Sequence, residues 1–107
     1  MLTTQELNAT VQRIIGNVSQ PSKVILFGSY ARGDADEGSD LDLMVIEQDL
    51  PDKAAEYLKL KQAIGRIGVG VDLLLFSEYE FQRRSQVPGT VLYWAKKEGK
   101  ILHDSAA

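Results

Sequence analysis

Three aspartates are the residues of this chain best suited to chemistry. Asp40 and Asp42 stand two positions apart at the start of one apolar run, and Asp72 lies within a second, Val71–Phe76. Side chains alternate along a strand, so Asp40 and Asp42 should project from the same face. A lone carboxylate in apolar surroundings is costly, so Asp72 needs a partner. If the two runs form neighbouring strands, three negative charges converge.

A convergence of three carboxylates favours the binding of divalent cations. Like charges repel one another, and hard cations that take oxygen ligands relieve the repulsion. The chain has no cysteine and one histidine, so a metal site must rest on oxygen ligands or on His103. Magnesium is the first candidate. Two ions about 4 Å apart could stabilise the attacking and the leaving oxygen of an in-line phosphoryl displacement.

Gly28 and Ser29 supply features that suit a phosphate. They follow the apolar run at 23–27 and precede the paired aspartates. A glycine after a strand lets the backbone approach a phosphate closely. Ser29 opens a segment that can form a helical turn, where a hydroxyl and backbone N–H groups favour an anion. Together with the aspartates, these residues predict a site for phosphoryl transfer.

Helices and strands alternate along the chain and position these residues. Strands are predicted at 23–27, 40–46, 69–76 and 101–103, and 28–39 reads as a functional loop with one helical turn at 30–32. Capping boxes start helices at Thr3 with Glu6 and at Ser77 with Glu80. Further helices are predicted after Pro51, with Tyr57, Leu60, Ile64 and Ile67 on one apolar face, and from Thr90 to a C-cap at Gly99. The pattern predicts an α/β or α+β fold with a central sheet packed by helices.

The spacing of these motifs resembles a known enzyme signature. Gly28-Ser29, ten intervening residues and Asp40-Leu41-Asp42, with a third aspartate on a later strand, resemble the polymerase β type nucleotidyltransferases. The segments Gly-Ser-Tyr-Ala-Arg-Gly and Ser-Asp-Leu-Asp-Leu are similar to the corresponding motifs of the MNT proteins, which are the antitoxins of HEPN/MNT toxin–antitoxin pairs. The resemblance implies the polymerase β-like fold with a mixed central sheet.

The resemblance also implies roles for individual residues. Asp40 and Asp42 would bind both magnesium ions, and Asp72 would bind the catalytic one and help to activate the acceptor hydroxyl. Gly28 and Ser29 would hold the triphosphate of ATP. We assign Arg32, which lies inside the motif, a role in binding phosphate or anchoring the loop.

The composition fits one folded domain over residues 1–107. Hydrophobic residues make up 44% and charged residues 25%, as in ordinary globular proteins. No apolar stretch approaches the ~20 residues that span a bilayer, and the N-terminus lacks the pattern of a signal peptide, so we expect a cytoplasmic protein without membrane contact. The net charge of -3 argues against direct nucleic-acid binding.

The leading functional hypothesis is an antitoxin that transfers AMP from ATP to a hydroxyl, on a tyrosine, of a cognate HEPN ribonuclease toxin. A chain of 107 residues has little room for an acceptor-binding domain, so we expect the acceptor to come from a partner in a hetero-oligomer. One alternative is neutralisation by binding and occlusion alone. The other is nucleotidyl transfer to a small molecule.

Overall fold

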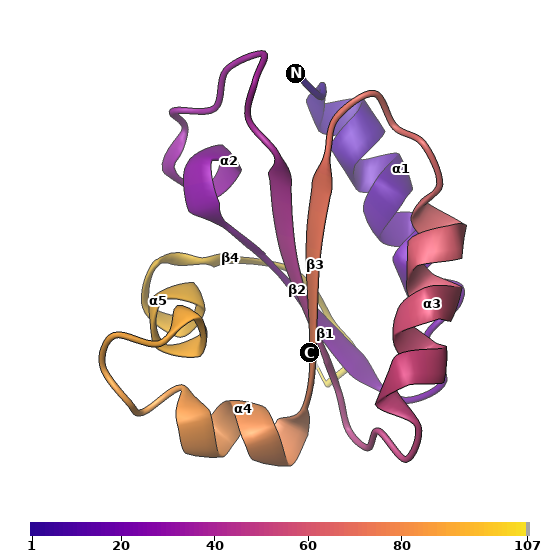
Figure 1. Cartoon of the computed structure of the whole chain (residues 1–107), viewed down its shortest axis with the longest axis vertical. Coiled ribbons are helices and arrows are strands. Elements are labelled where there is room, and N and C mark those ends of the chain that lie inside the picture. The colour runs from indigo at the N-terminus through magenta and orange to yellow at the C-terminus, as the bar shows by residue number, and fades with distance from the viewer. Residues whose placement is uncertain (107) are drawn as a thin grey trace.

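The computed structural model describes residues 1–106 and places a four-stranded sheet between two groups of helices (Figure 1). In chain order the elements are α1 (Thr4–Ile15), β1 (Ser22–Phe27), α2 (Gly28–Arg32), β2 (Leu41–Glu47), α3 (Lys53–Ile64), β3 (Val71–Ser77), α4 (Glu78–Arg84), α5 (Val91–Glu98) and β4 (Lys100–Asp104).

The sheet is mixed, as the resemblance predicted. Its strand order is β3-β2-β1-β4. Strand β2 runs antiparallel to β1 and parallel to β3, and β4 runs antiparallel to β1. The crossover through α3 makes β2 and β3 parallel. The N-terminal ends of these two strands therefore lie at the same end of the sheet.

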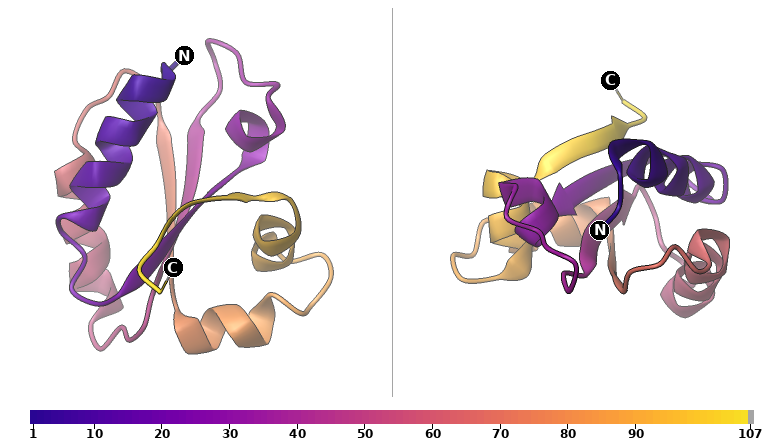
Figure 2. Two further views of the ribbon diagram at one scale, coloured as in Figure 1. Left: turned by 180° about the vertical axis from the view of Figure 1, so that it is seen from behind. Right: turned by 90° about the horizontal axis from the view of Figure 1, so that it is seen from above.

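The two faces of the sheet support two separate cores. Helices α1 and α3 cover one face, while α4 and α5 cover part of the other (Figure 2). Alternate residues of β2 follow this division. Leu41, Leu43 and Val45 enter the core beneath α1 and α3. Met44 and Ile46 enter the core beneath α4 and α5, and Asp42 shares their side of the strand.

Capping residues set the helix starts where the sequence predicted them. Thr3 and Glu6 form a complete capping box at α1, and Ser77 and Glu80 form another at α4. Thr90 caps α5 through the Tyr93 N–H. Each cap satisfies backbone N–H groups that the helix itself leaves unpaired.

Several details differ from the predictions. The segment after β1 forms the short helix α2 from Gly28 onward, so the helical turn begins two residues earlier than expected. In α3, Tyr57 is exposed and Glu56 is buried in its place, while Ile67 lies beyond the helix end. Gly99 has a negative φ, so it is not a left-handed cap. A Cβ there would lie 3.1 Å from the Leu26 carbonyl oxygen, and close packing explains the glycine.

Within residues 1–106, no helix has both the length and the apolar character needed to cross a membrane.

Candidate active site

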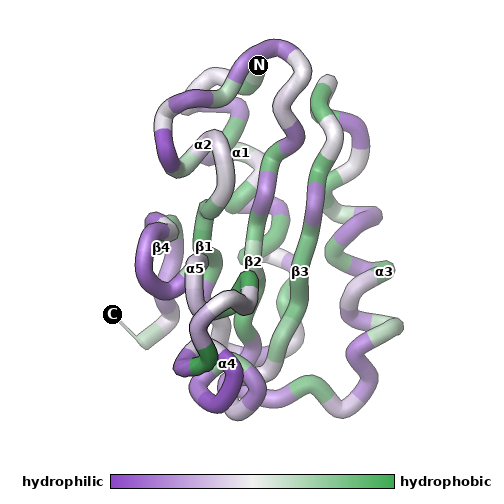
Figure 3. The backbone as a smooth tube through the Cα atoms, turned by 60° about the vertical axis from the view of Figure 1, so that its left-hand side comes forward, coloured by the Kyte–Doolittle hydropathy of each residue, from purple (hydrophilic) through white to green (hydrophobic). Residues whose placement is uncertain are grey.

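Asp42 and Asp72 lie side by side on neighbouring strands. They are direct partners in the parallel register of β2 and β3, near the start of both strands. Figure 3 shows the corresponding hydrophilic stretches at the same height on two otherwise largely hydrophobic strands. Asp42 is half-buried, whereas Asp72 is exposed because β3 is an edge strand. The expectation that Asp72 is embedded in apolar surroundings was therefore wrong, and Asp42 is the more buried acid.

Asp40 precedes β2 and lies against the chain that leads into β3. The Leu41 N–H donates to the Gly70 carbonyl over 2.8 Å, which joins the two strands at this point. A Cβ on Gly70 would lie 3.0 Å from the Asp40 Cγ atom. Gly70 therefore leaves the space that the Asp40 carboxylate fills, a role that sequence reasoning did not assign.

Gly28 makes a similar space for Asp42 from the other side. Its φ of +71° is in the region that favours glycine, and a Cβ there would lie 2.9 Å from the Asp42 Cγ atom. Phe27, which immediately precedes Gly28, is the register partner of Asp42 on β1. The turn from β1 into α2 thus runs directly past the Asp42 carboxylate, and any side chain at position 28 would displace that group.

The electrostatics of Asp42 reflect this crowding. Burial raises its pKa to about 6, and the hydrogen bond and negative charge of Asp72, with the charge of Asp40, add to the shift. The Arg32 guanidinium opposes the rise in pKa. Two carboxylates can share a hydrogen bond only when one carries a proton. With a pKa of about 6, Asp42 loses this proton as the pH rises toward neutral, and the two ionised carboxylates then favour a cation between them.

The motif residues Ser29 and Arg32 lie on α2, beside the carboxylates. No side chain within residues 1–106 caps the start of α2, whose N-cap position is Phe27. The first-turn N–H groups are thus not engaged by a capping side chain. Arg32 is exposed, and its Nε donates to Asp34 Oδ2 over 3.4 Å. This contact anchors the guanidinium to the following loop and keeps it close enough to act on the pKa of Asp42.

The donor set suits a hard divalent cation, although the side chains are not arranged as a finished metal site. Asp40, Asp42 and Asp72 offer carboxylate oxygens, which magnesium prefers. Across residues 1–106, no three acidic, histidine or cysteine groups are positioned to hold one ion as they stand. The spaces left by Gly28 and Gly70 against Asp42 and Asp40 give these carboxylates their positions on the same side of the sheet.

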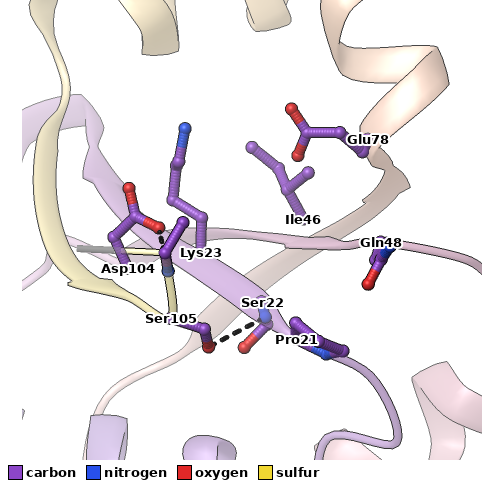
Figure 4. Close-up of a pocket in the computed structure, with 9 residues that line it drawn as sticks. Pro21, Ser22, Lys23, Ile46, Gln48, Glu78, Asp104 and Ser105 are labelled. Atoms are coloured by element: carbon purple, nitrogen blue, oxygen red, sulfur yellow. Dashed lines mark hydrogen bonds between the residues drawn. The ribbon is translucent and has the colours of Figure 1, made fainter.

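A cavity of about 350 Å³ lies at the opposite end of the sheet from these residues (Figure 4). Its wall includes Lys23 and Ile46, which are register partners near the far ends of β1 and β2, together with Asp104. The aspartates stand at the other end of β2 and do not contribute to this cavity. Lys23, Glu78 and Asp104 are its charged lining residues, and none of them belongs to the motifs at the start of β2 and β3.

A second pair of acids was missed by sequence reasoning. Glu47, the last residue of β2, is fully buried, and neither of its carboxylate oxygens has a hydrogen-bond donor within residues 1–106. Glu56 of α3 lies next to it and accepts from the Ser19 N–H over 2.9 Å and from the Ser19 hydroxyl over 2.7 Å. Lys59 pairs with Glu56 over 3.1 Å. In the sequence, Glu47 falls just after the strand predicted at 40–46, and no pattern there indicates that it is buried.

The pKa values of Glu47 and Glu56 are shifted in opposite directions. Burial raises the pKa of Glu47 to about 7, and the hydrogen bond and charge of Glu56 add to the rise. Burial acts against ionisation of Glu56 too, but the hydrogen bonds from Glu47, Ser19 and Lys59 outweigh it and lower the pKa of Glu56 to about 2. At moderately acid pH, Glu47 therefore holds a proton that it donates to an ionised Glu56.

Comparisons with known proteins find matches over most of this chain. The family described as Polymerase beta, Nucleotidyltransferase matches residues 9–106. Three proteins of Methanocaldococcus jannaschii, provisionally named protein adenylyltransferases, are also similar. One is 42% identical over 50% of this chain and 52% of its own length, and another is 37% identical over 61% and 48%. The chain therefore spans about half the length of these two relatives.

Solved structures with low sequence identity share the fold. A crystal structure of a toxin–antitoxin with AMP-PNP has a TM-score of 0.66 and 24% identity, covering 92% of this chain and 73% of that one. A structure of a mutant toxin–antitoxin, MntA-HpeT, has a TM-score of 0.63 and 21% identity, with 91% and 71% covered. A nucleotidyltransferase structure from Sulfolobus solfataricus, also named provisionally, has a TM-score of 0.58 and 24% identity, with 92% and 86% covered.

Proposed function

Because the chain belongs to the polymerase β nucleotidyltransferase family, we propose that it transfers AMP from ATP to a hydroxyl group of a partner toxin and so acts as an antitoxin. The observation that carries the proposal is the register of Asp42 with Asp72, flanked by Gly28 and Asp40. Acids on two strands and the turn that suits a phosphate occupy one end of the sheet.

In the proposed reaction, an acceptor oxygen attacks the α-phosphorus of ATP. The bond from that phosphorus to the bridging oxygen breaks, and pyrophosphate leaves with its electron pair. The hydroxyl proton passes to the exposed Asp72 carboxylate, while Gly28 and Ser29 hold the triphosphate beside the start of α2. Asp40, Asp42 and Asp72 would hold two magnesium ions, which stabilise the attacking and leaving oxygens when bound.

The electrostatics of the site support a role for cations and phosphate together. The pKa of Asp42 is raised first by burial and then by the hydrogen bond and charge of Asp72 and the charge of Asp40. A bound divalent cation would offset both the burial and the repulsion. Arg32 would place a positive charge near the phosphates on the same side. This guanidinium pairs with Asp34 of the loop and not with Asp40, Asp42 or Asp72.

The partner and the acceptor are inferred from the relatives. The adenylyltransferase names of the matched proteins favour AMP transfer to a protein, and the toxin–antitoxin structures favour a toxin as that protein. We propose a HEPN ribonuclease as the toxin and a tyrosine as the acceptor, on the basis of the sequence resemblance to MNT antitoxins. A cytoplasmic hetero-oligomer follows from that assignment.

Labelled ATP tests the reaction directly. Purified partner, this protein and magnesium are incubated with ATP labelled either at the α- or at the γ-phosphate. AMP transfer predicts that the α-label becomes bound to the partner while the γ-label leaves in pyrophosphate. The γ-label on the partner would indicate phosphorylation and contradict the proposal. No label on a partner that is nonetheless inhibited would favour occlusion.

A further inference from the structure

The outer edge of β3 has free backbone groups. The ladder with β2 is regular from Leu41 with Val71 to Glu47 with Ser77. The Gly70 carbonyl faces β2, so alternate residues place the backbone groups of Leu73 and Leu75 on the opposite side. Lys61 Nζ donates to the Val71 carbonyl over 3.1 Å, as expected for an outward-facing group. Within residues 1–106, no turn, loop or side-chain hydrogen bond reaches the backbone of Leu73 or Leu75.

An apolar groove of about 670 Å³ runs along this edge. It is lined by Lys53, Ala54, Tyr57 and Leu58 of α3 and by Leu73–Phe76 of β3. Four consecutive strand residues contribute although their side chains alternate between the two faces, so the groove follows the strand edge. Leu58 is 60% exposed and Tyr57 37%. These two side chains form an apolar rim beside the hollow.

The opposite edge of the sheet, formed by β4, is protected against pairing with another chain, whereas the β3 edge is not. Strand β4 carries Lys100, His103 and Asp104, and its ladder shifts register between Val24 and Ile25. Charges and bulges at an edge strand discourage pairing with another chain. After Asp72, the edge of β3 has neither, because Leu73–Phe76 is uncharged and its ladder is continuous. The fold thus protects one edge and leaves the other available.

We propose that a second copy of this chain pairs edge to edge with β3, antiparallel, about a two-fold axis at Leu74. Leu73 of each copy then faces Leu75 of the second copy, and each such pair exchanges both of its backbone hydrogen bonds. The two α3 helices come to the same side of the joined sheet, and Tyr57 and Leu58 of each cover the groove of the other. This inference goes beyond the proposed function; the two share one residue, Asp72, which lies at the end of the paired strands.

Charge selects a second copy over other occupants. In this register Asp72 of one copy faces Phe76 of the second copy. Lys53 Nζ lies 4.6 Å from the centroid of the Phe76 ring, and among the described residues that line the groove it is the one charged group. Glu80 lies 3.8 Å from this ammonium and already serves the cap of α4. Antiparallel pairing therefore brings a lysine and an aspartate together at both ends of the interface.

The molecular mass in solution tests the proposal. Light scattering after gel filtration should give twice the 11.8 kDa of one chain for the wild type and 11.8 kDa for Leu58→Asp, which puts a charge in the interface. Val87→Asp is the matched control, because Val87 is 51% exposed and lies outside the groove. It should remain dimeric. Both substitutions replace exposed side chains, so both variants should fold, which circular dichroism checks.

Amide hydrogen exchange identifies the surface. The Leu73 and Leu75 amides should exchange slowly in the wild-type dimer and at least tenfold faster in Leu58→Asp. A wild-type monomer, a dimer that survives Leu58→Asp, or fast exchange at both leucines within a dimer would overturn the proposal. A monomer in which these amides become protected only on addition of a toxin would assign the groove to that protein instead. None of these readouts depends on nucleotidyl transfer.

Discussion

Replacing Glu47 with glutamine should change how the stability of the protein depends on pH. In the folded protein the pKa of Glu47 is about 7, against 4.5 for an ordinary glutamate. The folded state therefore keeps a proton that the unfolded chain releases as the pH rises above 4.5. The free energy of unfolding therefore falls as the pH rises from 4.5 to 7, and this loss of stability is complete above pH 7.

The size of the effect follows from the shift in pKa. Each pKa unit corresponds to about 1.4 kcal/mol, so full ionisation of Glu47 should cost the folded state about 3 kcal/mol. A glutamine at position 47 cannot ionise, and its amide can donate to Glu56 as the protonated carboxyl does. Glu47→Gln should therefore match the wild type well below pH 4.5, and should exceed its free energy of unfolding by about 1 kcal/mol at pH 5 and by about 3 kcal/mol at pH 8.

Urea denaturation followed by circular dichroism at pH 5, 6, 7 and 8 measures this difference. The comparison must be with the wild type at each pH, because Asp42 has a pKa of about 6 and titrates in the same window in both proteins. A free-energy difference that does not grow with pH would refute the assignment of the proton to Glu47.

Glu56→Gln provides the opposite case. The low pKa of Glu56, about 2, contributes stability above pH 4.5 that is lost as the pH falls toward 2. A neutral amide there loses the ion pair with Lys59 and the charged acceptor for Ser19. This variant should be less stable than the wild type at pH 5. Equal stability at pH 5 would mean that Glu47, and not Glu56, carries the charge.

Two further predictions concern the active site. Gly28→Ala should destabilise the fold by about 1 kcal/mol more than Gly33→Ala and should abolish nucleotidyl transfer. Both glycines have a positive φ, but an added Cβ would meet Asp42 at position 28 and nothing at position 33. Equal losses of stability in urea melts would contradict the close approach of Gly28 to Asp42. Asp42→Asn should raise the melting temperature without ligand at pH 8, because it removes one charge from repelling carboxylates, and should remove the further stabilisation by magnesium with ATP; unfolding of this variant would instead indicate a structural role.

The sequence predicted the parts of the fold that depend on neighbouring residues. The capping boxes at Thr3 and Ser77 form because the cap and its reciprocal acid stand three positions apart, and both appear in the structure. The alternation of side chains that placed Asp40 and Asp42 on one face also divides the apolar residues of β2 between the two cores. The register of Asp42 with Asp72 also required β2 and β3 to be neighbours, which the sequence pattern left as a condition.

Features that depend on strand order and packing were not visible in the sequence. Asp72 is exposed because β3 is an edge strand, and alternation alone cannot distinguish an edge from a centre. Glu56 is buried and Tyr57 exposed because α3 turns its polar residue toward Ser19 and Glu47, against the simple preference for burying apolar side chains. Gly70 falls within the strand predicted at 69–76, and the sequence did not indicate that its lack of a Cβ makes room for Asp40.

The most direct test of the central claim is the mass of the partner toxin isolated from cells. Asp40→Asn with Asp42→Asn removes two carboxylates from the site and leaves the α3 surface and the β3 edge unchanged. The toxin from cells with the wild-type protein should gain the mass of one or more AMP units, and the double variant should still bind the toxin but neither modify it nor protect growth. Full protection by the double variant, with no change in toxin mass in either strain, would contradict nucleotidyl transfer as the means of neutralisation.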